Sequence, residues 1–218
     1  MSNHVAPKRK RVRFAVLPLA TSISAAALLA VSMSGTLSGF VAGLSNVGNA
    51  AASGSLVMEE KTTGSKPVTC VSTDGGSISS NTASCSTINE FGGSTTMVPG
   101  QTVSTAVTLT NVGTAAARTF TLAPGATCEQ SANAAAVGSG TATDFCSKLK
   151  VVISSGSSTV FTGTAANLAG SAVKTLNTAP ITPGTSTPFT IAVTLDQSAS
   201  NAYQGLSASV PLTWTFTS

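Results

Sequence analysis

The sequence predicts an all-β protein, an antiparallel jelly-roll-like β-sandwich that follows an N-terminal signal helix. First, apolar and polar residues alternate with a period of two in several segments, as in strands that bury one face. Second, turns rich in serine, glycine and proline separate these segments at intervals of roughly 8 to 12 residues, which is typical of antiparallel sandwiches. Third, only 8% of the 218 residues are charged, and β-branched residues recur throughout the chain, a composition that suits pleated strands.

The clearest predicted strand covers residues 206–216, close to the C-terminus. Its odd positions are serine, threonine or proline, and its even positions are the apolar residues Leu206, Ala208, Val210, Leu212, Trp214 and Phe216. One face of this strand is therefore expected in the core, with Trp214 as a packing residue. Pro211 lies on the other face and cannot donate a hydrogen bond to a neighbouring strand, which predicts an edge position or a bulge.

The same alternation predicts two long strands in the middle of the chain, over residues 103–109 and 189–195. A Pro-Gly pair precedes each of them, at positions 99–100 and 183–184, and marks the turn that leads into the strand. About eight to ten strands are expected in all, which favours a sandwich over a parallel sheet.

Turns and one helix complete the predicted body. Residues 111–114 include an asparagine and a glycine, which favour turns, and lead into a strand that contains Phe120 and Leu122. A hairpin is predicted over residues 149–161, with serines and a glycine at its turn. The only helix expected after the leader covers residues 143–149, with Thr143 as its cap.

Basic residues are concentrated at the start of the chain. Five of the 11 lysines and arginines lie within the first 13 positions, and an apolar run over residues 14–30 follows. A basic start, an apolar stretch and then small residues form the pattern of a secretory signal. We therefore assign residues 1–52 to an export segment and residues 53–218 to the sandwich domain. The body then has six bases and seven acids, a formal charge of 6 − 7 = −1, which argues against a nucleic-acid partner.

The candidate cleavage site lies between Ala52 and Ser53, because Ala50 and Ala52 are the small residues that a signal peptidase accepts. Two alternatives remain open, an earlier cut, for instance after Ala27, and an uncleaved leader that stays in the membrane as an anchor. The signal peptidase is thus an expected partner during export. We expect the body to be secreted, extracellular or at the cell surface, and to meet the membrane only through an uncleaved signal.

All four cysteines follow the leader, and an even number in an exported chain predicts two disulfides. Three pairings are possible. We favour Cys70 with Cys85 and Cys128 with Cys146, because each pair brackets a stretch rich in small and polar residues that is not expected to order itself. Closing loops of this length contributes roughly 3 kcal/mol each in the chain-entropy model.

The body lacks the side chains of a recognisable catalytic or metal site. The sole histidine of the chain, His4, lies in the leader, and the cysteines of the body are expected to be oxidised. The one acidic pair, Glu59 and Glu60, would point to opposite faces of a strand and is interpreted as a solvated strand end. We therefore predict a protein that is not an enzyme and that uses no cofactor and no metal ion.

Several short motifs resemble those of the TasA/camelysin-like family of exported proteins, in particular its actinobacterial members with an alternate type of signal peptide. Besides the arginine-rich leader, the motifs are Ala-x-Ser-Gly-Ser-Leu at 51–56, Leu-Thr-Asn-Val-Gly at 109–113, Tyr-Gln-Gly-Leu at 203–206 and Val-Pro-Leu-Thr-Trp at 210–214. The resemblance implies a jelly-roll sandwich, processing by a dedicated signal peptidase, and assembly into extracellular biofilm fibres. Some members have been described as metalloproteases, but the chain contains no H-E-x-x-H motif, so that activity is not carried over.

The resemblance also implies a mode of assembly, in which the N-terminal strand of one subunit completes the sheet of the next. The corresponding donor strand is Ser53 to Glu60, which also includes Leu56, Val57, Met58 and Glu59. Leu56 and Met58 would lie on the inserted face. The leading hypothesis is a fibre or biofilm-matrix subunit whose partner is another copy of itself. The alternative is a monomeric cell-surface adhesin or carbohydrate-binding sandwich.

Overall fold

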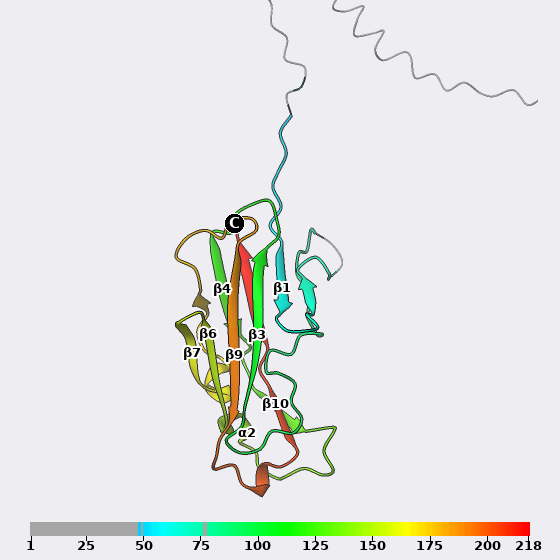
Figure 1. The fold of residues 1–218 in the computed structure, drawn as a ribbon, viewed down its shortest axis with the longest axis vertical. Coiled ribbons are helices and arrows are strands. Elements are labelled where there is room, and N and C mark those ends of the chain that lie inside the picture. The colour runs from blue at the N-terminus through cyan, green and yellow to red at the C-terminus, as the bar shows by residue number, and fades with distance from the viewer. Residues whose placement is uncertain (1–47, 49, 76–77) are drawn as a thin grey trace, which may run out of the picture. The chain divides into compact units, whose positions relative to one another are not determined.

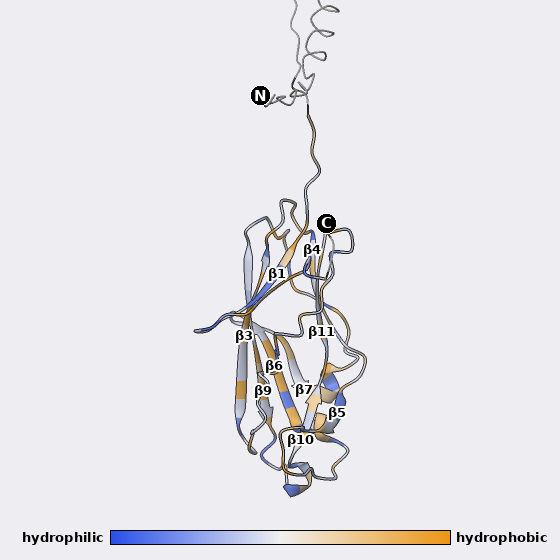
Figure 2. Ribbon diagram, turned by 90° about the vertical axis from the view of Figure 1, so that its right-hand side faces the viewer, coloured by the Kyte–Doolittle hydropathy of each residue, from blue (hydrophilic) through white to orange (hydrophobic). Residues whose placement is uncertain are grey.

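The computed structural model describes residues 48, 50–75 and 78–218. Within it, Ala52–Ser218 forms one compact unit, whose regular secondary structure is mostly antiparallel strands in two facing layers (Figure 1). Figure 2 shows the layers from the side, with β3 and β9 in one and β4 and β11 in the other. The predicted all-β sandwich is confirmed.

The first layer is a six-stranded sheet with the order β2-β1-β3-β9-β6-β7. Its strands are β1 (Met58–Thr62), β2 (Thr69–Val71), β3 (Thr102–Asn111), β6 (Leu149–Ser155), β7 (Ser158–Thr164) and β9 (Ser186–Leu195). The two long strands expected from the sequence, β3 and β9, pair with each other from Thr102↔Thr194 to Thr110↔Ser186. The predicted hairpin is β6 and β7, with Gly156 at positive φ in its turn.

The second layer is smaller and is divided into two parts, with the strand orders β11-β4-β8 and β10-β5. Its strands are β4 (Thr119–Pro124), β5 (Glu129–Ala132), β8 (Lys174–Thr175), β10 (Leu206–Ser209) and β11 (Leu212–Thr217). The strand predicted over 206–216 is therefore two strands with different partners. The break falls at Pro211, whose carbonyl accepts a hydrogen bond of 2.7 Å from Gly125 N, and this irregularity matches the expectation for proline there.

The core lies between the two layers and is centred on aromatic residues. Phe120 of β4 and Phe189 of β9 are almost fully buried and meet edge to face, with 5.8 Å between ring centroids. Trp214 of β11 lies 4.6 Å from Phe189. Leu109, Leu122, Val151, Ile153 and Ile191, which are all inaccessible to solvent, complete this cluster. Burial of these faces explains the period-two alternation in the sequence.

The turn at Asn111–Thr114 joins the two sheets rather than two paired strands, because β3 and β4 belong to different layers. Asn111 is completely buried. Its Nδ2 donates to the carbonyls of Ala115 (2.8 Å) and Ile181 (2.9 Å), and its Oδ1 accepts from Gly113 N (3.1 Å). An amide side chain with both donors and acceptor satisfied is well suited to such a buried corner.

The helices differ from the prediction in two respects. The expected helix is present as α2 (Phe145–Lys148), but Asp144 rather than Thr143 occupies its N-cap position, and Asp144 makes no capping hydrogen bond. In addition, the expectation of a single helix is wrong, because α3 (Ala165–Leu168) and the 3₁₀ turn η1 (Asn201–Tyr203) are also present. Both are single-turn elements, too short to produce a helical hydrophobic pattern in the sequence.

Most of the predicted export segment and its signal helix lies outside the described residues. Among the residues that the structure describes, no helix is both long and apolar enough to cross a membrane.

Candidate functional site

The first strand of the body, β1, lies inside the large sheet and is paired on both sides. With β3 it forms a ladder from Met58↔Asn111 to Thr62↔Val107, and with β2 it forms a second, shorter ladder. In the isolated chain the candidate donor strand thus pairs with its own subunit.

The residues that precede β1 are fixed to the turn after β3. The carbonyl of Ser55 accepts hydrogen bonds from Thr114 N (2.7 Å) and Ala115 N (2.8 Å), and the carbonyl of Val57 accepts from Val112 N (2.9 Å). The segment 55–57 is therefore held mainly by hydrogen bonds of its backbone, while its side chains are only half-buried.

The candidate cleavage residues Ala50, Ala52 and Ser53 are exposed and outside any helix or strand. Since β1 begins at Met58, a cut after Ala52 leaves the whole strand in the mature chain.

The side chains of the candidate donor strand alternate about the sheet. Leu56, Met58 and Glu60 face a cavity of about 610 Å³, whereas Val57 and Glu59 are half-buried and do not line it. Leu56 and Met58 therefore lie on the same face of the chain, the pair of residues for which the resemblance implies a common inserted face. Glu60 lies on the same face and is only 7% exposed, so its interpretation as part of a solvated strand end is wrong.

This cavity is a groove between the edge of the second sheet and a loop that covers β1. One wall is β11, the opposite wall is residues 81–91, here called the covering loop, and the floor is formed by β1 and by Leu109 of β3. The first layer has six strands, whereas the second consists of sheets of three and two strands, and the groove lies at β11, where the three-stranded sheet ends. A volume of this size falls in the range of sites that bind ligands or peptide segments.

The wall formed by β11 is a free strand edge. Among the described residues, β11 pairs only with β4. The bond from Gly125 N to Pro211 O places the odd-numbered backbone groups of β11 on the β4 side. Backbone groups alternate along an antiparallel strand. The N–H and C=O groups of Leu212, Trp214 and Phe216 consequently point away from β4, toward the groove.

Two carboxyl groups meet inside the groove. Glu60 comes from β1 and Glu90 from the covering loop, and the two side chains are hydrogen-bonded to each other. Burial and the neighbouring charge of Glu60 raise the pKa of Glu90 to about 8, and burial also raises the pKa of Glu60. The pair therefore retains one proton at neutral pH, with protonated Glu90 donating to Glu60. One oxygen of Glu60, Oε1, is buried without a hydrogen-bond partner among the described residues.

Trp214 connects this carboxyl pair to the aromatic core. Its indole Nε1 donates a hydrogen bond of 2.7 Å to Glu90 Oε1, while its ring packs against Phe189 and Phe120. The residue is thus a packing residue, as predicted, and is also part of the wall of the groove. A buried tryptophan N–H normally finds such an acceptor.

Sequence reasoning missed Glu90, which provides half of the pair. The residue lies in a loop rich in serine, threonine and asparagine, and the only signal was its position between the apolar residues Ile88 and Phe91. Its partner Glu60 is 30 positions away (90 − 60), a separation that periodicity along a single strand does not connect.

The body contains both disulfides, in the pairing favoured from the sequence. Cys70 and Cys85 are joined with a Cα–Cα distance of 5.8 Å, and Cys128 and Cys146 with 6.3 Å. The first bond ties β2 to the covering loop and so fixes a wall of the groove. Two disulfides indicate an extracellular or otherwise oxidising environment.

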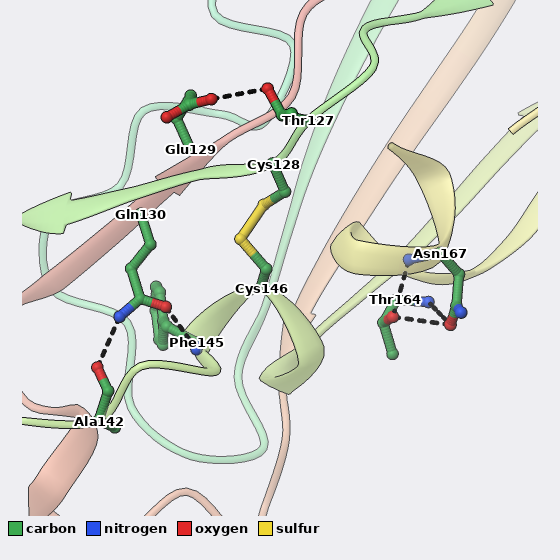
Figure 3. Close-up of a disulfide and its surroundings, with 9 residues drawn as sticks. All are labelled: Thr127, Cys128, Glu129, Gln130, Ala142, Phe145, Cys146, Thr164 and Asn167. Carbon is green, nitrogen blue, oxygen red and sulfur yellow. Dashed lines mark hydrogen bonds between the residues drawn. A yellow bond between two sulfur atoms is a disulfide. The ribbon is translucent and has the colours of Figure 1, made fainter. Parts of the chain in front are cut away.

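Figure 3 shows the second disulfide and the polar side chain next to it. Gln130 accepts a hydrogen bond from Phe145 N (2.7 Å) and donates one to Ala142 O (2.5 Å). Together with the bond between Cys128 and Cys146, it attaches α2 to β5. This end of the sandwich is therefore held by a covalent bond and by side-chain hydrogen bonds, in addition to the buried apolar residues Phe145 and Leu149.

The described residues include no group of three or more histidine, cysteine or acidic side chains placed to hold a metal ion. Asp74 and Asp196 accept hydrogen bonds from Val71 N and Ser198 N within their own turns, and Asp144 accepts one from the hydroxyl of Tyr203. The chemistry that the site offers is thus a free strand edge, an apolar groove and a carboxyl pair.

Comparison with known proteins adds no assignment, since no protein-family model and no curated protein matches this sequence.

Proposed function

We propose that this protein is a secreted structural subunit of extracellular fibres or of a biofilm matrix, which assembles head to tail by donating its N-terminal strand. The observation that carries the proposal is the position of β1. It is the first strand after the candidate cleavage site, it is held between β2 and β3 by backbone ladders, and its inward side chains line a groove of the remaining body.

The energetics of exchange follow from this geometry. If β1 of a neighbouring subunit occupied the same place, every pair from Met58↔Asn111 to Thr62↔Val107 would be formed again. The change in free energy would then be set by the entropy of association and by the connection to the neighbouring subunit. Each subunit would donate one strand and accept one, and a head-to-tail contact whose rotation does not close into a ring propagates as a filament.

The location of the protein supports the same proposal. The disulfides require an oxidising environment, and the basic, apolar leader is the pattern of an export signal. Cleavage after Ala52 by a signal peptidase would release a chain whose exposed start leads directly into β1. The resemblance to the TasA/camelysin-like family points to this class of extracellular assembly.

A cross-linking experiment distinguishes pairing within a subunit from pairing between subunits. Glu59 of β1 and Thr110 of β3 are partners in the ladder, and partners in an antiparallel pair are close enough for a disulfide. The double variant Glu59→Cys/Thr110→Cys is assembled, oxidised and run on a denaturing gel without reductant. Strand donation predicts a ladder of covalent multimers together with filaments in negative-stain electron microscopy.

The matched control is Lys150→Cys/Thr194→Cys, a pair in the same kind of register between β6 and β9. Both of its strands lie well inside the fold of one subunit. Filaments of this control variant should therefore give only a monomer band on the denaturing gel. If the variant with cysteines at Glu59 and Thr110 also gives only monomers while filaments are present, strand donation is wrong. If no filaments form at any concentration, the fibre function is wrong.

The groove favours one alternative function, that of a monomeric surface protein such as an adhesin or a carbohydrate-binding sandwich. Its wall includes Trp214, whose ring is half-buried, and aromatic rings in open grooves contribute binding surface. A folded protein that stays monomeric and binds glycans in an array would support this alternative.

A further inference from the structure

We propose that the groove beside β11 binds an extended segment of another protein, which adds a strand to β11 and places a lysine or arginine against Glu60 and Glu90. Residues of β1 line this groove, but binding along β11 does not require β1 to be exchanged. The groove is present with β1 in its place, so the two proposals can fail independently.

The first argument is the geometry of the β11 edge. Residues from both faces of this strand line the groove, with Leu212, Trp214 and Phe216 from the inner face and Thr213 and Thr215 from the outer face. A cavity that touches both faces must run along the edge of the strand rather than lie only beneath it. The backbone groups that point to this edge have no partner strand in the described chain, and an added strand would pair with them.

The second argument is the character of the space next to that edge. Leu56 and Met58 line the floor, and Ile88 and Phe91 of the covering loop line the opposite wall. An extended segment directs alternate side chains to opposite faces. Apolar side chains on one face of the incoming segment would therefore contact this surface, while its other face would remain in solvent beside Thr213.

The third argument is charge. With one proton shared, the Glu60 and Glu90 pair carries about one negative charge at neutral pH. No lysine or arginine contributes to the electrostatic environment of either carboxyl group among the described residues. Oε1 of Glu60 is buried without a partner, which leaves an acceptor for an incoming donor. A single cationic side chain would match both the charge and the free acceptor.

The fourth argument concerns the source of the segment. The chain that precedes β1, exposed at residues 50–54 and half-buried at 55–57, contains no basic residue. Lys61 belongs to β1 and Lys66 to its connection with β2, and the remaining bases of the body lie within or next to paired strands, namely Arg118, Lys148, Lys150 and Lys174. Among residues 50–75 and 78–218, a second copy of this chain therefore offers no free extended segment that carries a base. The occupant that fits is a strand from a different protein.

Trp214 is the sole tryptophan of the chain and lies in the wall of the groove, so its fluorescence reports occupation directly. The mature protein is titrated at pH 7 with the capped peptide Ser-Val-Thr-Lys-Thr-Val-Ser and with matched peptides in which norleucine or glutamate replaces the lysine. We expect a shift of tryptophan emission that saturates with the lysine peptide, and binding at least about tenfold weaker for the norleucine and glutamate peptides.

Two controls separate charge recognition from strand addition. In the variant Glu60→Gln/Glu90→Gln, checked for folding by circular dichroism, the preference for the lysine peptide over the norleucine peptide should disappear. A lysine peptide methylated on alternate backbone nitrogens, in both possible registers, should lose binding because it cannot pair with β11.

Four results would overturn the proposal. The first three are equal affinity of the lysine and norleucine peptides, undiminished binding of both methylated peptides, and the absence of any emission shift at millimolar peptide. The fourth is equally tight binding of a peptide that covers residues 50–60 of this chain, which would make the groove a site for a second copy.

Discussion

The carboxyl pair makes the stability of this protein depend on pH in a direction opposite to that of most surface acids. Burial raises the pKa of Glu90 from 4.5 to about 8, so the folded state holds a proton that the unfolded chain releases. The stabilisation is fully present below about pH 4.5 and is lost as the pH rises toward 8. Above that value both states have released the proton, and no further change from this group is expected.

The size of the effect follows from the same values. At about 1.4 kcal/mol per unit of pKa difference, a change from 4.5 to about 8 corresponds to on the order of 5 kcal/mol. Glu90 is not fully buried, and the groove can admit water, so a loss of a few kcal/mol is the expected result. This is a large fraction of the stability of an ordinary domain.

Urea unfolding followed by Trp214 fluorescence, repeated from pH 5 to pH 9, measures this dependence. In Glu90→Gln the amide is neutral at every pH, and it can accept a hydrogen bond from Trp214 and donate one to Glu60. Most of the decline in the free energy of unfolding with rising pH should therefore disappear. Glu129→Gln is the control, because Glu129 is an exposed acid on β5 whose loss should leave the wild-type profile unchanged. A wild-type stability that is constant from pH 5 to pH 9 would refute the reasoning.

Three further changes test other parts of the fold. Phe120→Ala removes the most central aromatic ring and should lower the free energy of unfolding by about 3–5 kcal/mol in urea titrations, and a loss below about 1 kcal/mol would contradict the packing described. Replacing Cys128 and Cys146 together by serine should lower the free energy of unfolding by about 3 kcal/mol, measured as a lower thermal midpoint. Added reductant should lower the midpoint of the wild type through this disulfide, but not that of the variant. A Cβ at Gly113 would collide with the backbone of Ser55, so Gly113→Ala should speed amide hydrogen exchange at the start of β1, whereas unchanged exchange there would show that this contact is not needed.

The features that the sequence alone predicted are local or repetitive. Alternation over 103–109 and 189–195 identified β3 and β9, because every second residue must reach the core. The positions of the cysteines indicated both disulfides, and Pro211 marked the break in the C-terminal strand. Each of these signals depends on residues that are close in the chain or on a covalent bond.

The features that only the tertiary structure decided depend on contacts between distant segments. Alternation placed Glu60 on one face of a strand, but whether that face is solvated or buried depends on the covering loop, which has no periodicity of its own. The pairing of Glu60 with Glu90 and the free edge of β11 likewise follow from the unequal widths of the two sheets. Sheet width is set by which strands pair, and pairing is a long-range choice that local sequence patterns do not encode.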